Sequence, residues 1–322
     1  MATGSSTTQI SLASEVTEGA ISFDRLMQIT DDFSKEREIG AGALGTVYKG
    51  IIDGGGVIAV KRHVGNAIGT HNRAEHKAKV QSLMEKNHEN VARLLAFCYE
   101  NRNEVRKRNG RNYSHHVVES LLCYEYLPKG SLHKNLFGDL ATIFDWNARF
   151  KIIKGICEGV RFLHKSCPPI LHLDLKPQNV LFDDNMVPKI TDFTYSRLLG
   201  EKETRMITKS SLGSVGYKAP EYLDHGEIST RTDIYSLGLM ILEIATREKN
   251  CPNADRQSAR DYVKKVKAEW TNHERILTEY PDLPQGCRDQ LNACIEIGLK
   301  CVNLNQNKRL KIVEIVNKLN GH

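Results

Sequence analysis

The residues with the clearest potential for chemistry are a glycine-rich segment and the lysine that follows it. Residues 40–47 read GAGALGTV, a GxGxxGxV pattern between two strand-like segments. Glycines let backbone amides approach phosphate groups, because no side chain intervenes. A dinucleotide-binding loop would need a helix directly afterwards, whereas residues 47–52 are strand-like, which favours a flap over nucleotide phosphates. Lys61, sixteen residues after Gly45 at the end of an apolar run, is the candidate that pairs with those phosphates.

A second group of polar residues follows later in the chain. Residues 172–179 read HLDLKPQN, and they are followed by DFT at 192–194 and APE at 219–221. Together with the glycine-rich segment and the lysine, and in this order, these motifs resemble those of the eukaryotic protein kinases from about residue 33 to residue 319. Three further segments are similar to the plant receptor-like and Pelle-type branch: residues 88–95, 122–132 and 213–222.

The resemblance implies a protein serine/threonine kinase in intracellular signalling that moves the γ-phosphate of ATP to protein hydroxyls, with ATP and Mg²⁺ as cofactors. Asp174 would orient the substrate hydroxyl and accept its proton, and Lys176 would steady the γ-phosphate. Asn179 and Asp192 would ligate Mg²⁺, since hard oxygen donors suit a hard cation. Tyr124 would be the gatekeeper, and Glu125 and Leu127 would offer backbone groups to adenine. The full set of implied cofactor-binding residues is Ile39, Gly40, Gly42, Gly45, Val47, Ala59, Lys61, Tyr124, Glu125, Leu127, Asn179, Leu181 and Asp192.

Two long-range contacts are implied by the same resemblance. Asp233 would tie down the backbone of the catalytic loop at 172–179, and Glu221 would pair with Arg309. Both contacts would join parts of the chain that are far apart in sequence.

The elements that must position these residues change in type near residue 130. Glycine-rich turns between apolar runs predict strands in the first part of the chain. Those strand-like segments are 33–64, 91–99 and 117–126, with one helix at about 74–86. Apolar residues at helical spacing predict helices in the second part. Those helices are 146–164, 234–245 and 291–302.

This segregation predicts the α+β class. The expected architecture is a bilobal protein-kinase-like fold with a small β-rich N-lobe and a large α-helical C-lobe, and with the ATP cleft at their junction. The predicted boundaries are an N-terminal tail and lead-in segment at 1–32 and a kinase domain at 33–320, with the N-lobe at 33–126 and the C-lobe at 127–320.

Three positions depart from the family pattern. Lys79 stands where the glutamate that pairs with Lys61 belongs, and two ammonium groups repel each other. Glu75 lies one turn earlier on roughly the same face and could take that role if the helix shifted. Thr194 replaces a glycine after Asp-Phe, where a β-branched residue is expected to hold the magnesium loop differently. Leu173 replaces an arginine, which predicts weaker control by phosphorylation of the activation loop.

These departures leave two functional hypotheses. The retained glycines and Lys61, Asp174, Asn179 and Asp192 favour an active kinase. Lys79 and Thr194 favour a slow enzyme or, as the alternative, a nucleotide-binding pseudokinase that acts as a signalling scaffold.

Composition and charge indicate which partners and which cellular location to expect. The 322 residues include 45 Lys and Arg and 39 Asp and Glu, which gives a mild net charge of +6. No basic motif with interleaved aromatic residues is present. Nucleic acid is therefore not expected as a partner. The polar segment 101–116 is expected to be a solvated hairpin loop, with a basic docking patch as the alternative. Eight cysteines without a CxxC pair predict a reducing, intracellular setting. Within the family that the chain resembles, the absence of a signal or membrane segment makes it similar to the receptor-like cytoplasmic kinases. Protein substrates and a receptor complex are its expected partners, with recruitment to the inner face of the plasma membrane.

Overall fold

The computed structural model describes residues 19–42, 45–63, 73–108, 111–138, 144–200, 203–208, 213–214, 216–251 and 258–322. Residues 1–18 of the predicted tail and lead-in segment at 1–32 therefore lie outside the described residues. The chain divides into two compact units, Met1–Asn87 with Ala92–Leu127, and His88–Val91 with Pro128–His322. The first unit is rich in strands and the second in helices, which confirms the α+β class.

The first unit is built on a five-stranded antiparallel sheet in the order β1-β2-β3-β5-β4. Its strands are β1 Glu38–Gly42, β2 Gly45–Ile51, β3 Val57–His63, β4 Leu94–Arg108 and β5 Arg111–Glu125. Its helices are α2 Phe23–Ile29, the 3₁₀ turn η1 Lys35–Arg37 and α3 Arg73–Met84. The helix α2 begins after Ser22, whose hydroxyl accepts a hydrogen bond from the Arg25 amide at 3.2 Å and so caps the first turn.

The two faces of this sheet have different roles. Successive side chains on a strand point to opposite faces, so Lys61 and Ala59 share one face and Val60 and Ile58 share the other. The second face packs against α2 in a buried cluster of Ile21, Phe23, Leu26, Ile29, Ile52, Ile58, Val60, Ala96, Cys98, Leu121 and Cys123. The helix within the predicted lead-in segment therefore covers one face of the sheet, and Lys61 lies on the opposite face.

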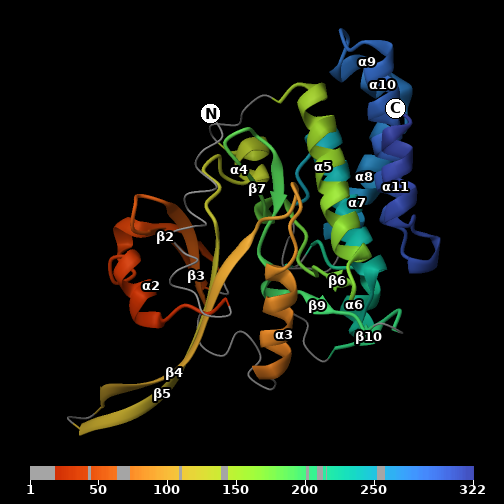
Figure 1. Cartoon of the computed structure of the whole chain (residues 1–322). Helices are drawn as coiled ribbons and strands as arrows, with labels where there is room; N and C mark the ends of the chain where they lie inside the picture. Colours follow the sequence, from red (N-terminus) through yellow and green to blue (C-terminus); the bar gives the residue numbers. More distant parts are fainter. Residues whose placement is uncertain are drawn as a thin grey trace. The chain divides into compact units, whose positions relative to one another are not determined.

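The strands β4 and β5 form a long hairpin that extends well beyond the other strands of the sheet (Figure 1). Their pairing runs from Leu94 opposite Tyr124 to Arg108 opposite Arg111. The prediction of a loop at 101–116 was therefore wrong, because cross-strand pairing continues to Arg108 and Arg111 and satisfies the backbone of this polar segment. Most of the side chains that the structure describes in this segment are exposed. Val105, for example, is 73% exposed.

The second unit consists of helices and three short two-stranded sheets. Its helices are α4 Leu132–Phe137, α5 Trp146–Lys165, α6 Pro220–His225, α7 Thr230–Thr246, α8 Ser258–Trp270, α9 His273–Glu279, α10 Gln285–Cys301 and α11 Ile312–Asn320. Its strand pairs are β6 Ile170–Leu171 with β9 Arg197–Leu198, β7 Val180–Phe182 with β8 Pro188–Ile190, and β10 Met206–Ile207 with β11 Glu227–Ile228. Its 3₁₀ turns are η3 Pro177–Asn179, η4 Phe193–Tyr195 and η5 Gln306–Lys308. The three helices predicted here from apolar spacing correspond to α5, α7 and α10.

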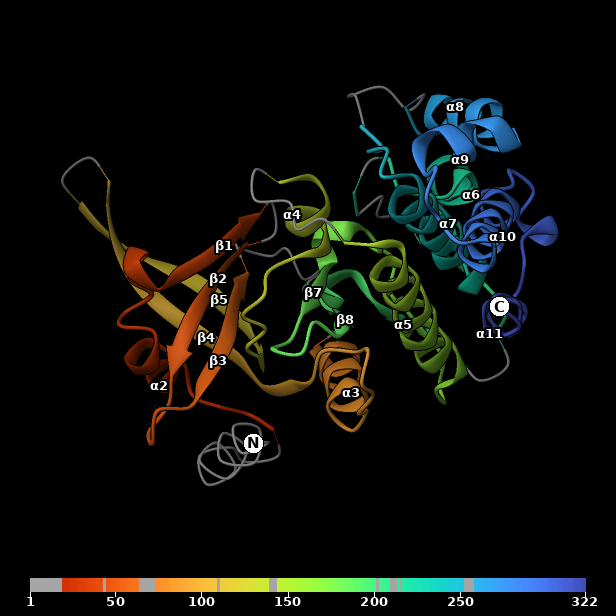
Figure 2. The same cartoon turned by 90° about the horizontal axis from the view of Figure 1, so that it is seen from above.

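Helix α7 forms the centre of this unit and is buried along almost its whole length. It contacts α5 and α10, and α5 also contacts α11 (Figure 2). Glycines allow the closest approach, since a Cβ on Gly238 of α7 would lie 2.6 Å from Cβ of Cys301, and one on Gly298 of α10 would lie 2.7 Å from Leu242. All eight cysteines are free thiols. Among the described helices, none has both the length and the apolar character needed to cross a bilayer.

Candidate active site

The residues predicted for catalysis meet in the loop that follows β6. The Asp174 carboxylate is 3% exposed, and its Oδ2 atom lies 2.8 Å from the amide nitrogen of Asn179 and 2.9 Å from the Lys176 ammonium. The Asn179 amide nitrogen also donates to the Asp174 carbonyl at 2.8 Å. Three groups that the sequence singles out are therefore in direct contact around one carboxylate.

An aspartate from α7, in contact with a histidine from α5, holds this loop in place. The Asp233 carboxylate, 1% exposed, accepts hydrogen bonds of 2.8 Å from the backbone amides of His172 and Leu173. The His164 ring lies 2.9 Å from the same carboxylate. Burial acts to raise the pKa of Asp233, but the hydrogen bond from His164 and the two nearby histidines outweigh it and hold the pKa below its ordinary value. The implied role of Asp233 is confirmed.

The strand β8 leads into a segment that carries the second predicted magnesium ligand. The amide of Thr191 donates to the Asn179 carbonyl at 2.8 Å, which ties this segment to the catalytic loop. Asp192 has left-handed backbone angles, with φ 66° and ψ 66°, and caps η4. The expected conflict at Thr194 does not arise in the backbone, because Thr194 lies in η4 and the positive φ belongs to Asp192. The side chain of Thr194 instead donates to Asp192 Oδ1 at 2.6 Å.

Two residues at the Asp174 carboxylate had not been singled out from the sequence. Ser214 donates its amide to Asp174 Oδ1 at 2.8 Å, and its hydroxyl accepts from the Lys176 ammonium at 2.5 Å. Tyr195 lies near Asp174 and Asp192, and burial together with these two carboxylates raises the pKa of Tyr195 to about 12. Asp174 thus receives donors on both carboxylate oxygens, which fixes its orientation.

A buried carboxylate from α7 anchors the segment after Ser214. The Tyr217 hydroxyl donates to both oxygens of Glu243, at 3.0 and 2.8 Å, and the Asn250 amide donates to one of them at 3.0 Å. The Asn250 side chain donates in turn to the Gly216 carbonyl at 3.0 Å, and the Ser236 hydroxyl donates to the Tyr217 carbonyl at 2.7 Å. Burial raises the pKa of Glu243 from 4.5 to about 7.

This raised pKa predicts a pH-dependent stability. Between about pH 4.5 and 7 the folded chain keeps a proton on Glu243 that the unfolded chain releases, so the stability contributed by this group falls as the pH rises and is lost above about pH 7. Glu243→Gln keeps the acceptor for Tyr217 but does not titrate. We expect the free energy of unfolding of the parent, relative to Glu243→Gln, to fall by up to about 3 kcal/mol between pH 5 and 8.

Urea titrations of both proteins at several pH values measure this difference. Glu85→Gln is the matched control for the loss of a carboxylate, because Glu85 is exposed, and no comparable fall is expected there. A constant difference for Glu243→Gln as well would contradict the prediction.

Leu173 occupies the arginine position of the family within an apolar cluster. It has a left-handed backbone with φ 64° and is 7% exposed. The cluster consists of Leu171, Leu173, Leu199, Tyr222 and Ile228, with Tyr195 and Met206 packed against it. Apolar packing therefore joins the catalytic loop to the segment between β9 and β11, at the place where a charged contact was expected. The predicted weaker control by phosphorylation stays a prediction.

Four predicted nucleotide residues of the first unit, Val47, Ala59, Lys61 and Tyr124, share one face of its sheet. Val47 lies opposite Lys61 in the β2–β3 pair, and Ala59 lies opposite Tyr124 in the β3–β5 pair. Lys61 is 8% exposed. At the end of β5, the Glu125 carboxylate accepts a hydrogen bond from the Arg93 amide at 2.9 Å, and the Glu125 amide donates to the Arg93 carbonyl at 3.0 Å.

The other predicted contacts of the first unit lie in or near the glycine-rich segment. A Cβ at Gly40 or Gly42 would meet nothing within 4 Å. Gly45 has φ 150°, and a Cβ there would clash with the Arg62 carbonyl oxygen, so this position requires glycine. Ile39 is 46% exposed.

Two further predicted nucleotide residues complete the set. Leu127 is 8% exposed in the first unit. Leu181 is half-buried on β7 of the second unit, where it pairs with Lys189.

The departure at Lys79 concerns α3. Lys79 is buried, with 6% exposed, whereas the side chain of Glu75 lies outside the described part of the structure. The hypothesis that Glu75 takes over the pairing with Lys61 therefore stays a prediction.

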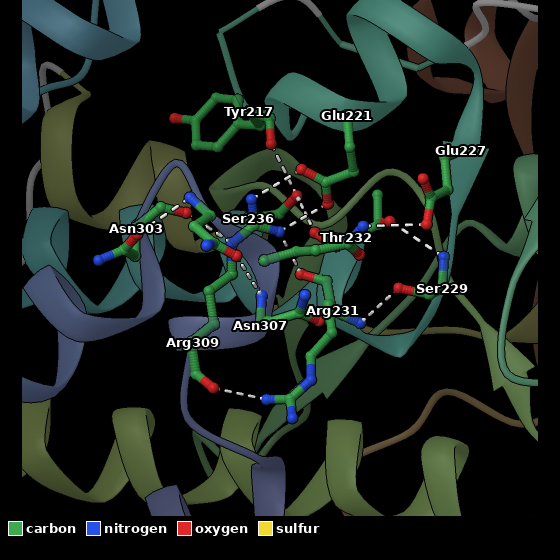
Figure 3. Close-up of polar contacts among 12 residues, drawn as sticks. Tyr217, Glu221, Glu227, Ser229, Arg231, Thr232, Ser236, Asn303, Asn307 and Arg309 are labelled. Carbon is green, nitrogen blue, oxygen red and sulfur yellow. Dashed lines mark hydrogen bonds and ion pairs between the residues drawn. The ribbon is translucent and has the colours of Figure 1, made fainter.

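A buried ion pair connects Glu221 on α6 with Arg309 (Figure 3). The Arg309 guanidinium donates to the two oxygens of Glu221 at 2.6 and 2.7 Å, as the resemblance implied. It also donates to the carbonyls of Asn303 and Arg231, both at 2.8 Å, and Arg231 donates back to the Arg309 carbonyl at 2.6 Å. This network joins α6, α7 and the chain before α11.

Comparisons with known proteins agree with this geometry. The family model described as "Protein kinase domain" matches residues 33–319. Cysteine-rich receptor-like protein kinases 44, 29 and 36 of Arabidopsis thaliana are 35%, 35% and 36% identical over 308, 309 and 282 residues. These alignments cover 94%, 94% and 87% of this chain, and 76%, 43% and 40% of the respective relatives. The chain therefore spans less than half the length of two of these three relatives.

Proposed function

The chain belongs to the protein kinase family, and we propose that it is an ATP-dependent serine/threonine kinase of the plant receptor-like type that transfers the γ-phosphate of ATP through Asp174 and the residues around it. The observation that carries this proposal is the contact of Asp174 with Lys176, Asn179 and Ser214. Phosphoryl transfer needs positioning and charge neutralisation more than covalent chemistry. A carboxylate held by donors on both oxygens suits the task of orienting a substrate hydroxyl and accepting its proton.

Lys176 has a second role in this proposal. Its ammonium lies 2.9 Å from Asp174 and 2.5 Å from the Ser214 hydroxyl. A cation in that position can stabilise the negative charge that develops on the transferring phosphoryl group. Ser214 fixes the direction of both side chains and so acts as a positioning residue.

The residues of the second unit fit a magnesium ion by the chemistry of their donors. The Asn179 amide nitrogen donates to Asp174, which directs the amide oxygen to be the ligand, and Asp192 supplies a carboxylate. Among the described residues, no cluster of three or more His, Cys, Asp or Glu could hold a metal by itself, and a cation that takes further ligands from phosphates needs none. When bound, the ion neutralises phosphate charge.

The first unit offers the nucleotide contacts. In this proposal Lys61 pairs with the α- and β-phosphates, the glycines at 40, 42 and 45 admit the phosphates, and Tyr124, Glu125 and Leu127 meet the adenine. The open space at Gly40 and Gly42 supports this assignment. We assign residues 33–126 and 127–320 as the two lobes of one kinase domain.

The expected partners follow from the family. Protein kinases act on proteins, and we propose serine and threonine hydroxyls of signalling proteins as substrates and a receptor complex as the setting, since the relatives are named receptor-like kinases. Eight free thiols support a reducing compartment. We therefore propose action in the cytoplasm, at the inner face of the plasma membrane.

The test is an autophosphorylation assay with ATP and Mg²⁺, with myelin basic protein added as a generic substrate. We expect the parent to incorporate phosphate, and Lys61→Met to lose at least about 10²-fold in kcat/KM, because a buried cation at the phosphates is removed. Lys318→Met on α11 is the control, since Lys318 is exposed. An inert parent that still binds ATP would favour the pseudokinase alternative, and Lys61→Met with parental activity would contradict the assignment.

A further inference from the structure

The side chain of Thr194 contacts a proposed magnesium ligand where the family resemblance predicts a glycine. Its hydroxyl donates to Asp192 Oδ1 at 2.6 Å, and its amide lies 3.4 Å from the same oxygen. Thr194 is 4% exposed. Glycine could supply only the amide, so the hydroxyl contact depends on the threonine side chain.

The surroundings fix both ends of this contact. Phe193, 1% exposed, packs edge-on against the His172 ring at 5.1 Å. The Ser196 hydroxyl donates to the Phe193 carbonyl at 2.6 Å, which closes the turn that carries Thr194. Thr194 therefore presents its hydroxyl from a rigid turn, and a hydrogen bond to a carboxylate is among the stronger ones available.

The same segment is tied to the other proposed ligand. The Thr191 amide and hydroxyl both donate to the Asn179 carbonyl, at 2.8 and 3.1 Å. Asn179 is held in turn by Asp174. The Thr191 hydrogen bonds fix the backbone before Asp192 relative to Asn179. The hydrogen bond from Thr194 to the Asp192 carboxylate therefore also fixes the position of that carboxylate relative to Asn179.

We propose that Thr194 is a positioning residue for the divalent cation, whose hydroxyl holds the Asp192 carboxylate in the orientation that binds it. This inference rests on the proposed function. The residue that marks a departure from the family would then support metal binding, because a hydrogen bond from a neighbouring side chain lowers the cost of ordering a carboxylate ligand.

Metal affinity measured directly tests this role. Mn²⁺ binding is titrated by electron paramagnetic resonance in the presence of a non-hydrolysable ATP analogue. Thr194→Val keeps the shape of the side chain and removes the hydroxyl, and Thr194→Ser keeps the hydroxyl. We expect Thr194→Val to bind Mn²⁺ about 10-fold more weakly than the parent, and Thr194→Ser to stay within about twofold.

Thr246→Val is the matched control. Thr246 on α7 is also 4% exposed, and its hydroxyl donates to the Leu242 carbonyl at 2.7 Å, so the substitution removes a comparable buried hydrogen bond away from the loop. In turnover, Thr194→Val should raise the Mg²⁺ concentration needed for half-maximal rate by the same factor and recover kcat at saturating Mg²⁺. A merely structural role would lower kcat at every Mg²⁺ concentration.

The outcomes separate this inference from the proposed function. Equal Mn²⁺ affinity in the parent and Thr194→Val, or equal weakening in Thr194→Ser and Thr194→Val, would overturn the inference alone. A parent that binds no Mn²⁺ with the nucleotide would overturn the proposed function, and the inference with it. If Thr194→Val does not fold, Thr194→Ala provides the same comparison.

Discussion

Replacing Asp174 by asparagine is expected to lower kcat for phosphate transfer by about 10²- to 10⁴-fold, the range attributed to a positioned acid or base. The asparagine oxygen can still accept from the Ser214 amide, but the side chain can no longer take a proton from the substrate. Its amide would also face the Lys176 and Asn179 donors that now contact Oδ2. Initial rates at saturating ATP and Mg²⁺ measure the effect.

Nucleotide affinity should respond differently from the rate. Asp174 faces the substrate hydroxyl in the proposed mechanism, so Asp174→Asn should retain ATP binding in the presence of Mg²⁺, whereas Asp192→Ala should weaken it. Asp224→Asn on α6 is the control for the charge change, since Asp224 is exposed. A rate for Asp174→Asn within tenfold of the parent, or unchanged nucleotide affinity in Asp192→Ala, would contradict the assigned roles.

The sequence predicted the catalytic loop well because its chemistry is local. Asp174, Lys176 and Asn179 lie within six residues, so a turn of almost any geometry brings them near one another. The pairing of Asp233 with the loop backbone is different, since 60 residues separate Asp233 from Leu173. Composition and periodicity could not predict this contact, and only the family resemblance implied it.

The extension of the hairpin strands through 101–116 was missed although a signal for it was present. Asn109-Gly110 is the dipeptide most typical of two-residue hairpin turns, and Arg108 does pair with Arg111 across it. The polar composition of the flanking residues hid this signal, because strands are usually recognised by apolar alternation. A hairpin that projects from the sheet needs no apolar face.

Thr194 shows a different limit of the sequence argument. The expectation that Thr194 holds the magnesium loop differently rested on the backbone angles that glycine allows at this position. The positive φ in fact belongs to Asp192, whose side chain accepts a hydrogen bond from Thr194. Aspartate tolerates this backbone region better than β-branched residues do. Which residue of a short segment adopts the unusual angles depends on the side-chain hydrogen bonds that form, and residue type alone does not fix them.

The anchoring of the segment after Ser214 had no local signal. Glu243 lies on a helix that reads as apolar, and Tyr217 lies 26 residues before it. Glu243 is the single carboxylate in the apolar run 237–245. Because burying a charged group without a hydrogen-bond or ionic partner is costly, such a partner is expected for it. That argument indicates that a partner exists but cannot identify Tyr217.

Arg309→Met is expected to lower the free energy of unfolding of the second unit by about 3–5 kcal/mol, because it leaves the Glu221 carboxylate buried without its counterion. The Arg309 side chain is fully buried, and that of Glu221 is 9% exposed. The substitution also removes the hydrogen bonds to the carbonyls of Asn303 and Arg231. Glu221→Gln should cost less, since its amide oxygen still accepts one of the two bonds. Guanidinium titrations measure both values.

An exposed ion pair of the same type provides the control. Arg205 lies 3.4 Å from Glu227 with its side chain 69% exposed, so Arg205→Met should cost less than about 1 kcal/mol. The double substitution Glu221→Met with Arg309→Met separates charge from packing. Because no lone buried charge remains, it should destabilise the unit by less than the sum of the single substitutions. Two results would contradict this prediction: additive effects of the two single substitutions, or a cost for Arg309→Met as small as that for Arg205→Met. Either result would show that the buried ion pair contributes little to the free energy of unfolding. The apolar contacts of α7 would then provide the stability of this part of the unit.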